Sequence, residues 1–579
     1  MLLINPAAAN FGGFLSRYVP VGIPVAIGVL AAYLHKNNIK CEVIDEEISR
    51  VDLLQLDEII DRLDMRSKPI FGLSCLTAHV GRAYEIAKLI KDNIPNSVVI
   101  FGGLHPSTMP AEALATGCAD FVVKGEGEIV LYELLKSIYG ATDCKNVLGI
   151  YYLEDGELQY TGDAPLIPDI NLIPMFPYHL FEHPKYDRGF ITTSRGCPYR
   201  CSYCSQRILT GTTYRYKNTD NVMAELDILV NKYKQKAIVF YDDNFCLKSK
   251  RVHELCDRLI ENKFPGRVDL SVQTRADNVL IHGGETLVRH MSEAGFTHMG
   301  FGLETGSQRI ADLTRKDETV QVHLDAASLC QKHNMDVSFF MIFGFPTETK
   351  EDRKMGYDAV MKANLSATKY NNLIPYPGTP LWNELKGSGR VVKTKDWANF
   401  NSVLAMTSSV FDKTPLPYVP ETTSEWELKR DIIRYNFKSY VNAKSLAAIF
   451  GHTKGIGWFM LPEMWWKKPR ELFEISKIAF NVIINYVMVT MPLWLSKTIM
   501  EALDKKLRLR QAVKDYDPST YVQIDWDRDS VVEISKQLRK AKQDLEDTGN
   551  IEKIYKVDFI SKNEYKSKAK DKINELTQA

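Results

Sequence analysis

The sequence has little cysteine and no excess of charge of either sign. Its 579 residues include 10 cysteines, too few for a disulfide scaffold in a chain of this length. The 73 basic and 72 acidic side chains leave a formal net charge of +1. This balance excludes general electrostatic attraction to nucleic acid or to an anionic membrane, so any such contact would have to be local. We expect no nucleic-acid partner.

The beginning of the chain also lacks the marks of export. Residues Met1 to Pro6 have neither the basic segment nor the sustained apolar run of a secretory signal peptide. We therefore expect a cytoplasmic location and reduced thiols. With 45% hydrophobic and 25% charged residues the composition is that of a globular protein, and at about 150 residues per domain the length predicts roughly three or four folding units.

Residues 1–140 alternate short β-rich runs with helical patterns, which predicts an α/β domain with a doubly wound, flavodoxin-like (Rossmann-type) parallel sheet. Small residues follow several of these runs, at the sheet edge where ligands bind in such folds. The predicted strands are Leu2 to Ile4, Cys41 to Asp45, Ile70 to Ser74, Val98 to Gly102 and Phe121 to Lys124.

The pattern changes twice along the rest of the chain. Residues 141–188, with a hairpin around Asp155 and five prolines, predict a linker. Residues 189–400 contain six more β-rich runs, each before a helical stretch, which predicts a partial (β/α)6 barrel. Residues 401–579 predict a mainly helical C-terminal region. The predicted barrel strands are Phe190 to Ser194, Ala237 to Asp242, Asp269 to Arg275, His298 to Glu304, Asp336 to Phe343 and Ala367 to Ile374.

Three cysteines gather directly after the first predicted barrel strand. Cys197, Cys201 and Cys204 have the spacing C-x3-C-x2-C. Three thiolates on one loop can hold three irons of a [4Fe–4S] cube, whereas structural zinc takes four ligands. Two other interpretations stay open at this point: a zinc site that borrows a remote His or Cys, and three unrelated core thiols.

This spacing at the end of the first barrel strand resembles the radical SAM superfamily, and motifs at later strand ends extend the resemblance to about residue 380. The resemblance implies that the open iron binds S-adenosylmethionine and that the reduced cluster cleaves it to a 5′-deoxyadenosyl radical. It also implies an external one-electron reductant of the flavodoxin or ferredoxin type.

The resemblance also implies residues that contact S-adenosylmethionine. The Tyr203 backbone should meet the adenine, and Asp243, Arg275 and Glu304 are candidates for the polar parts of S-adenosylmethionine. The later motifs are Tyr241-Asp242-Asp243-Asn244-Phe245, Gln273-Thr274-Arg275, Gly302-Leu303-Glu304-Thr305, Gly344-Phe345-Pro346 and Pro375-Tyr376-Pro377-Gly378-Thr379-Pro380.

A flavodoxin-like domain ahead of such a barrel resembles the branch of the superfamily that carries a cobalamin (B12)-binding domain. The segment Val19-Pro20-Val21-Gly22-Ile23-Pro24 and the glycine-rich loops stand as that branch has them. Glycines let the backbone approach a bulky corrinoid and its nucleotide tail, and hydroxyl groups can bond to them. The residues expected at cobalamin are Ser74, Thr77, Gly102, Gly103, His105, Gly125, Glu126 and Gly127.

One pattern of other cobalamin proteins is absent. The D-x-H-x-x-G motif that supplies a lower histidine to cobalt does not occur, and His79 lacks both the Asp and the spaced Gly. We expect His79 to be a loop or helix-start residue. The expected state is cobalamin with its own base displaced and no histidine beneath the metal.

These resemblances lead to a functional hypothesis with named alternatives. We expect a C-methyltransferase that acts on an unactivated carbon of a small-molecule or lipid-like substrate. The alternatives are a cyclase or rearrangement enzyme of the same branch, a cluster-bearing binding or electron-transfer protein, and a zinc-binding interaction module. No sequence motif identifies the catalytic residues or the substrate.

One late segment, Ile478 to Leu495, contains no charged residue and has basic flanks. Its length barely reaches a membrane span, and Asn481, Asn485 and Pro492 weaken insertion. Two interpretations stay open: a helix that lies in the membrane interface, giving peripheral membrane contact, and a buried helix packed on the barrel. Tryptophans 458, 465 and 466 lie nearby in the sequence.

Overall fold

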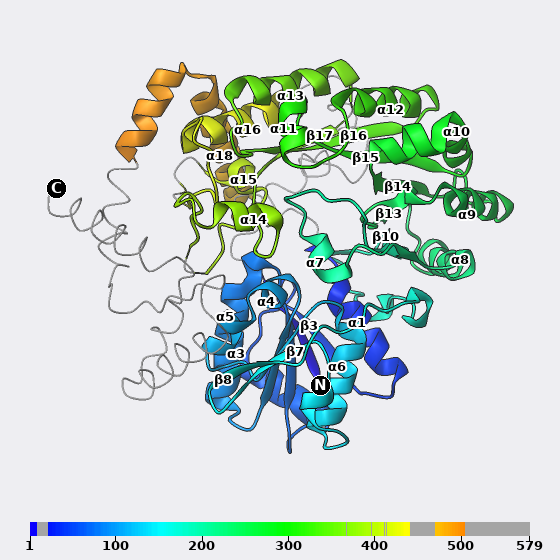
Figure 1. The fold of residues 1–579 in the computed structure, drawn as a ribbon, viewed down its shortest axis with the longest axis vertical. Coiled ribbons are helices and arrows are strands. Elements are labelled where there is room, and N and C mark those ends of the chain that lie inside the picture. The colour runs from blue at the N-terminus through cyan, green and yellow to red at the C-terminus, as the bar shows by residue number, and fades with distance from the viewer. Residues whose placement is uncertain are drawn as a thin grey trace.

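The computed structural model describes residues 1–7, 21–365, 367–394, 396–409, 412, 414–440 and 469–503. The first domain, blue to cyan in Figure 1, lies against the green barrel domain, and the C-terminal helices lie beside the barrel. The α/β architecture with a helical C-terminal region is the one predicted. Val19, Pro20 and the tryptophans at 458, 465 and 466 fall outside the described residues.

The first domain is built on a seven-stranded sheet of order β3-β1-β4-β5-β6-β7-β8. The first five of these strands run parallel, and their order is the flavodoxin-like 2-1-3-4-5. The order reverses between β1 and β4, which places the ligand-binding crevice of such a sheet at their carboxyl ends. The strands are β1 (Leu2–Asn5), β3 (Glu42–Asp45), β4 (Ile70–Ser74), β5 (Val98–Gly102), β6 (Phe121–Val123), β7 (Ile150–Glu154) and β8 (Glu157–Tyr160).

The hairpin around Asp155 extends this sheet. β7 runs antiparallel to β6, and β8 runs antiparallel to β7. The sheet of the first domain therefore continues to Tyr160, within the segment that the sequence assigns to the linker. The four-part division of the chain stays a prediction.

Both faces of the first sheet are covered, because successive strand side chains point to opposite sides. Leu2 and Ile4 belong to one core cluster, and Leu3 between them belongs to another. Residues of α2, α3 and α5 fill the first cluster, and residues of α1 and α6 fill the second. These helices, and the short α4 that precedes α5, are α1 (Val25–Lys36), α2 (Leu53–Arg62), α3 (Val80–Asn93), α4 (Leu104–Thr108), α5 (Pro110–Ala115) and α6 (Gly127–Ile138).

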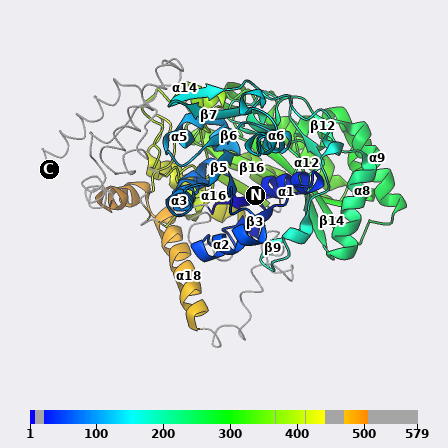
Figure 2. The ribbon, with the colours of Figure 1, turned by 90° about the horizontal axis from the view of Figure 1, so that it is seen from below.

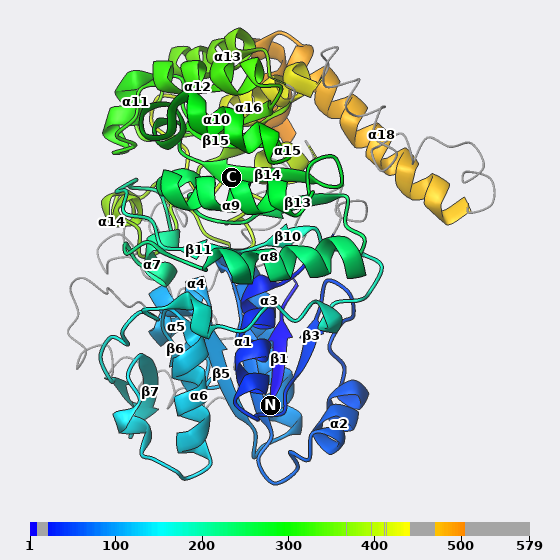
Figure 3. The same ribbon diagram turned by 90° about the vertical axis from the view of Figure 1, so that its right-hand side faces the viewer.

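The second domain contains a six-stranded, all-parallel sheet of order β10-β13-β14-β15-β16-β17, as predicted for a partial barrel. Helices cover its outer face (Figure 3). The strands are β10 (Phe190–Ile191), β13 (Ala237–Phe240), β14 (Asp269–Thr274), β15 (Phe296–Glu304), β16 (Asp336–Phe343) and β17 (Ala367–Asn372). The main helices are α8 (Thr219–Asp227), α9 (Ser249–Glu261), α10 (Gly284–Glu293), α11 (Gln308–Leu313), α12 (Val320–Lys332), α13 (Lys350–Ala363) and α14 (Pro380–Leu385).

The first barrel strand is shorter than predicted. β10 ends at Ile191, and the chain then turns into β11 (Ser194–Arg195), which pairs antiparallel with β12 (Arg215–Tyr216). Buried Asp242 holds the turn, because its Oδ1 accepts from the backbone N–H groups of Thr193 at 2.6 Å and Ser194 at 3.0 Å. This bend directs the cysteine loop away from the sheet.

A segment beyond the barrel returns to the first domain. Trp397 and Phe400 are fully buried in a core cluster made by β1, β4, β5 and the helices on that face. The Trp397 indole Nε1 donates to Glu112 Oε1 of α5 at 2.9 Å. The two domains are therefore joined by this anchor as well as by the preceding linker.

The C-terminal region is helical where it is described. It contains α15 (Leu404–Thr407), α16 (Glu425–Tyr440), α18 (Pro469–Thr490) and a further helix over 493–503. Figure 2 shows α18 projecting from the body of the molecule. No helix within the described residues is both long and apolar enough to cross a membrane.

Candidate functional site

The three predicted cluster cysteines lie on one loop between β11 and α7 (Gln206–Thr210). Two backbone hydrogen bonds fix the loop, from Cys197 N to Gly211 O at 3.3 Å and from Ser202 N to Thr314 O at 2.9 Å. The three thiols are free and partly buried. The loop therefore presents all three sulfur atoms from one rigid turn.

Gly196, directly before the first cysteine, is required by its surroundings. Its φ is +85°, and a Cβ atom there would lie 2.2 Å from the carbonyl oxygen of Thr213. Any side chain would collide with backbone that cannot move independently of β12. The glycine therefore sets the path of the loop into Cys197.

Burial affects the protonation of the cysteine thiols and so any metal that binds them. Burial raises the pKa of Cys197, and it raises the pKa of Cys204 to about 12, so metal binding must displace thiol protons. Within the described residues, no three His, Cys, Asp or Glu side chains converge closely enough to hold one metal ion. Three thiolates on one loop are the set of protein ligands that a [4Fe–4S] cube with one open iron takes.

Arg275, at the end of β14, lies behind Cys201. Its Nη1 is 4.0 Å from Cys201 Sγ and donates to the Lys316 carbonyl at 2.8 Å. Its Nη2 donates to Asp277 at 2.9 Å, and its guanidinium stacks on the Tyr199 ring at 3.6 Å. Burial opposes the charge, but the neighbouring carboxylates raise the pKa of Arg275 above its usual value. Its charge is therefore held next to a cluster sulfur.

Glu304 ends β15 in a strained conformation. It has a φ of +65° and follows a register shift between β15 and β16. A non-glycine residue in this region costs about 1–3 kcal/mol, and such strain concentrates at functional sites. Burial raises the pKa of Glu304, while Lys316 and a hydrogen bond from the Tyr203 hydroxyl lower it in part. Tyr203 and Glu304, two predicted S-adenosylmethionine residues, therefore touch.

Lys316 and Glu318 complete this buried charged group, and the sequence reasoning missed them. Both side chains are almost fully buried, with Lys316 Nζ 3.2 Å from Glu318 Oε2. Glu318 Oε1 accepts from the Asp277 backbone, and its Oε2 lies 3.4 Å from Arg275 Nη2. They belong to the charged run Arg315 to Glu318, which in sequence looks like an exposed turn. The backbone is left-handed at Arg315 and Asp317, and the residues that follow each of them, Lys316 and Glu318, have buried side chains.

Asp243 follows β13 and is bonded to α7, the helix directly after the cysteine loop. Its carboxylate accepts from Gln206 Nε2 at 2.6 Å and from Thr210 Oγ1 at 3.4 Å, both on α7. Burial raises its pKa above that of an ordinary aspartate. The structure thus divides the four predicted S-adenosylmethionine residues into two places.

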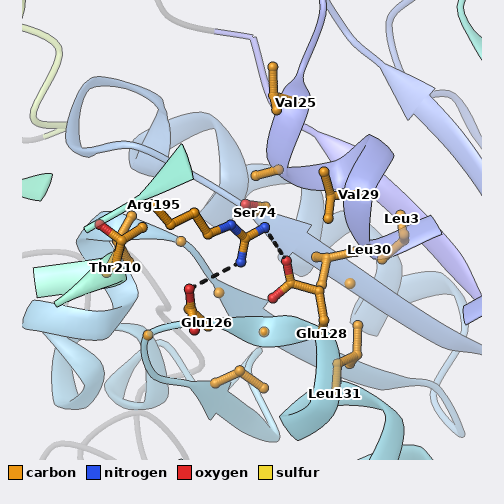
Figure 4. Close-up of a pocket in the computed structure, with 18 of the residues that line it drawn as sticks. Leu3, Val25, Val29, Leu30, Ser74, Glu126, Glu128, Leu131, Arg195 and Thr210 are labelled. Carbon is orange, nitrogen blue, oxygen red and sulfur yellow. Dashed lines mark hydrogen bonds and ion pairs between the residues drawn. The ribbon is translucent and has the colours of Figure 1, made fainter. Parts of the chain in front are cut away.

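A cavity of about 350 Å³ lies between the two domains. Its walls include the glycine-rich carboxyl edge of the first sheet, with Ser74, Gly103 and Gly127, and the barrel residues Arg195 and Asp243. Figure 4 shows Arg195 and Thr210 facing Ser74 and α1 residues across this space. The volume lies within the range of ligand pockets.

Glycines shape the sheet side of this cavity. Gly103 has a φ of +93°, and a Cβ atom there would lie 2.8 Å from the Cys75 carbonyl oxygen. Gly125 has a φ of +77°, and its N–H donates to Ser107 Oγ at 3.0 Å. Backbone rather than side chains therefore forms this edge, which is the surface needed for close approach of a large planar ligand.

Glu126, directly before α6, and Glu128, in the first turn of α6, bind arginines of the barrel domain. Glu128 Oε1 is 2.5 Å from Arg195 Nη2, and Glu126 Oε1 is 3.1 Å from Arg195 Nη1 (Figure 4). The other oxygen of Glu126 is 2.8 Å from Arg215 Nη1 and also accepts from Ile167 N. Burial disfavours the Arg195 charge, but the two carboxylates raise its pKa. The Glu126 carboxylate is thus committed to the domain interface.

Comparisons with known proteins agree with both halves of this site. Residues 14–135 match the family described as B12 binding domain, and residues 191–359 match the Radical SAM superfamily. The chain is a B12-binding radical SAM enzyme. Its cofactors are a [4Fe–4S] cluster, S-adenosylmethionine and cobalamin. The cysteine loop lies within the second match and the glycine-rich edge within the first.

Curated relatives of the enzyme are distant and have different names. It is 29% identical over 388 residues to an uncharacterized methyltransferase, PH0819, from Pyrococcus horikoshii, which covers 66% of this chain and 82% of the relative. It is 26% identical over 362 residues to an anaerobic magnesium-protoporphyrin IX monomethyl ester cyclase from Cereibacter sphaeroides, covering 61% of this chain and 58% of that protein.

A solved structure shows the same fold. The radical S-adenosylmethionine methyltransferase TsrM from Kitasatospora setae, solved with cobalamin and a [4Fe–4S] cluster bound, superposes with a TM-score of 0.57 at 21% identity. The match covers 68% of this chain and 75% of TsrM. At this identity the likeness concerns the fold alone.

The structure brings most, but not all, of the predicted cobalamin residues of the enzyme to the cavity. Ser74, Gly102, Gly103 and the 125–127 loop line it. Thr77 and His105 do not. His105 is a fully buried residue of α4, and the centroid of its ring lies 4.9 Å from that of Trp397. Thr77 is buried in the turn before α3. His79 lies in that same turn, with Nδ1 2.9 Å from the Pro6 carbonyl oxygen.

Arg195 is a lining residue of the enzyme that sequence reasoning did not select. It precedes Gly196 and Cys197, so it is next to the cysteine motif in the chain. Its partners lie 67 and 69 residues earlier. The sequence shows a basic residue beside the cysteine motif and a Gly-Glu-Gly-Glu run at 125–128. No sequence pattern indicates that the two form ion pairs with each other.

Proposed function

We propose that the enzyme is a C-methyltransferase that acts on an unactivated carbon of a small-molecule or lipid-like substrate. The observation that carries the proposal is the shared cavity, whose walls come from the glycine-rich edge of one domain and from barrel residues beside the cysteine loop of the other. A methyl-donor cofactor and a radical-generating site that share one chamber can act on the same substrate carbon. The relative from Pyrococcus horikoshii, named a methyltransferase, supports this choice.

The three cofactors supply the radical and methyl-transfer chemistry, and the side chains of the protein bind and orient them. When bound, the cluster with S-adenosylmethionine supplies hydrogen-atom abstraction, and cobalamin supplies the methyl group. In this proposal Cys197, Cys201 and Cys204 hold the cluster. Tyr203, Glu304 and Asp243 bind S-adenosylmethionine, and Arg275 holds positive charge beside Cys201.

The sheet edge would bind cobalamin without a histidine beneath the cobalt. No histidine is among the described residues that line the cavity, and His79 is turned toward the Pro6 carbonyl. In this proposal the cofactor binds with its own base displaced from the metal. Backbone N–H groups and the Ser74 hydroxyl provide its hydrogen bonds.

This lower-ligand proposal yields a spectroscopic prediction. His79→Ala should leave the paramagnetic resonance spectrum of Co(II)-loaded enzyme unchanged, because no protein nitrogen is bound to cobalt. The measurement is the nitrogen hyperfine pattern of the wild-type and variant enzymes. Nitrogen splitting that disappears in the variant would show that His79 is a ligand.

The proposal also includes a partner and a compartment. Reduction of the cluster requires one electron from outside the chain, for which we propose a flavodoxin- or ferredoxin-type protein. A reducing, cytoplasmic environment would keep the cluster cysteines as thiols before loading.

A cyclisation without methyl transfer is the second candidate function. It rests on the Cereibacter sphaeroides relative, which is named a cyclase. Both candidates need the same cofactors, and they differ in the product. A methyltransferase product carries one more methyl group than its substrate, and a cyclase product does not.

The test compares metabolites of cells with and without the protein, and then supplies the accumulated compound to the reconstituted enzyme with methyl-labelled S-adenosylmethionine. Methylation predicts label in the product, while an unlabelled, cyclised product would contradict it.

A second experiment tests the cluster ligands. A Cys197→Ala, Cys201→Ala, Cys204→Ala variant should lose both the cluster absorbance and S-adenosylmethionine cleavage. Cys144→Ala, which alters another partly buried thiol, is the matched control and should keep both.

A further inference from the structure

The outer face of α18 is apolar and exposed. Phe480 is 57% exposed and Ile483 is 62% exposed, and Tyr486 and Val487 are exposed beside them. In the next helix, Trp494 is 70% exposed. A surface helix of a globular protein normally directs charged and polar side chains to solvent, so this face has the reverse of the usual pattern.

The opposite face of α18 is firmly attached to the C-terminal unit. Met488 and Val489 are buried, and the buried Asn485 donates from Nδ2 to the Ser408 carbonyl at 3.1 Å. Arg430 of α16 donates to the Met491 carbonyl at 2.9 Å, and Trp426 donates to Ser496 at 3.1 Å. These bonds fix the rotation of the helix. The face with Phe480 and Ile483 therefore points outward because of packing, and α18 is neither fully buried nor free.

The position of α18 leaves that face accessible to a large surface. Figures 2 and 3 show the helix extending away from both domains. Residues three, four and seven apart lie on the same side of a helix, so Phe480, Ile483 and Val487 form one stripe along its length. Such a stripe suits a flat, extended partner more than a small ligand.

Charge and aromatic content indicate the nature of that partner. The charged residues between Glu474 and Glu501 are Lys477 and Lys497, and over the wider range 467–506 the chain has seven basic and four acidic residues. Tyr486 and Trp494 have ring bodies with polar groups, the side chains that are enriched at the boundary between lipid and water. An apolar stripe with basic ends and interfacial aromatics complements an anionic lipid surface.

We propose that α18 and Trp494 dock the enzyme on an anionic membrane, with the helix lying in the plane of the interface. Phe480, Ile483 and Val487 enter the boundary between headgroups and acyl chains, and Lys477 and Lys497 meet lipid phosphates. The helix does not cross the bilayer, in line with the absence of a spanning helix among the described residues. This docking is independent of the reaction proposed above.

The test is flotation of the full-length, cofactor-loaded enzyme with three samples: phosphatidylcholine vesicles containing phosphatidylglycerol, pure phosphatidylcholine vesicles, and no vesicles. The enzyme should float with the anionic vesicles and far less with the neutral ones. A Phe480→Ser, Ile483→Ser, Trp494→Ser variant should lose about tenfold or more of its partition into anionic vesicles, because it loses most of the inserted apolar area.

A matched variant separates location from general hydrophobicity. Leu54→Ser, Leu172→Ser, Ile281→Ser also removes three exposed apolar side chains, but elsewhere on the surface, and it should float like the wild type. Thermal midpoints and S-adenosylmethionine cleavage should be the same for all three proteins, which establishes that each is folded. Equal flotation of the α18 variant and the wild type, or no flotation of either, would overturn the proposal.

Light scattering tests the remaining alternative, in which the apolar face of α18 contacts a second copy of this chain. If the wild type is a dimer without vesicles and the α18 variant is a monomer, the face is a contact between two copies of this chain and the membrane proposal is wrong. An identical oligomeric state for both proteins, together with the flotation difference, supports the lipid surface.

Discussion

At the scale of single residues, Cys201 has a cation held against its sulfur. Arg275 cannot turn away from Cys201 Sγ, because Asp277, the Lys316 carbonyl and the Tyr199 ring fix its guanidinium on three sides. Hydrogen bonds and positive charge near cluster sulfurs stabilise the reduced state of an iron–sulfur cluster. Arg275 should therefore act as a positioning residue that tunes the cluster through its ligand.

Arg275→Gln should lower the reduction potential of the cluster. The variant removes a positive charge and leaves Asp277 and Glu318 without their common cation, and a tenfold effect on the reduction equilibrium corresponds to about 59 mV. Redox titration followed by paramagnetic resonance measures the shift. Arg200→Gln, in the same loop but paired to Asp317 in solvent, is the control and should leave the potential unchanged. Equal potentials in all three proteins would disprove the tuning role.

Gly196→Ala should prevent cluster assembly. Its Cβ atom would meet the Thr213 carbonyl oxygen at 2.2 Å, so the path into Cys197 must shift. Gly266→Ala is the control, because Gly266 also has a positive φ but has nothing within 4 Å of the added atom. The control should lose about 1–2 kcal/mol of stability and keep its iron. Iron content and chemical denaturation measure both effects, and full iron content in Gly196→Ala would contradict the prediction.

At the scale of elements, the start of α6 connects the two domains through buried ion pairs. The Arg195 guanidinium is about one-fifth exposed, and both carboxylates that bind it are almost fully buried. Loss of one partner from a buried pair costs far more than loss from a surface pair, because the remaining charge stays without compensation. The cavity wall and the start of the cysteine loop therefore depend on the same contact.

Arg195→Gln should destabilise the protein by about 3–5 kcal/mol and weaken cobalamin binding. Arg62→Gln is the control, since Arg62 pairs with Glu42 at 2.6 Å on the surface, and it should cost about 0–1 kcal/mol. Chemical denaturation gives the free energies of unfolding, and cobalamin titration gives the affinities. Similar losses in the two variants would show that Arg195 is no more than an ordinary surface partner.

Local patterns predicted the elements well and their long-range contacts poorly. The β-rich runs at Ile70 to Ser74 and Val98 to Gly102 are strands with those bounds, because apolar runs followed by turn residues determine local structure. The glycines at 102, 103 and 125 were placed at the cavity for the same reason. Glu126 was expected at the cofactor; it lines the cavity, and its carboxylate also binds Arg195 and Arg215. A pairing across 69 residues has no periodic signature in the sequence. The bend after Ile191 depends on Asp242, which also lies far along the chain.

At the scale of the whole molecule, Trp397 joins the segment beyond the barrel to the first domain. Its indole fills the core cluster on one face of the first sheet, touches His105 of α4 and donates to Glu112 of α5. α4 directly follows the Gly102-Gly103 edge of the cavity. Loss of this side chain should therefore loosen that edge as well as the core.

Trp397→Ala should cost about 3–5 kcal/mol of stability, as expected for truncation of a buried tryptophan, and should weaken cobalamin binding. Trp494→Ala, which truncates an exposed tryptophan, should change neither quantity. Thermal unfolding with and without cobalamin measures both effects. A Trp397→Ala enzyme with wild-type stability would show that the anchor is dispensable.

The anchor at Trp397 also sets the order in which this protein can be made. A ribosome produces the first domain long before it reaches residue 397. One face of the newly made sheet therefore lacks part of its core until the barrel residues have been translated. The pocket edge at Gly103 gains its support only then. Loading of the cofactor should therefore follow synthesis of the anchor segment, and a chain truncated before residue 397 should bind corrinoid more weakly than the full chain.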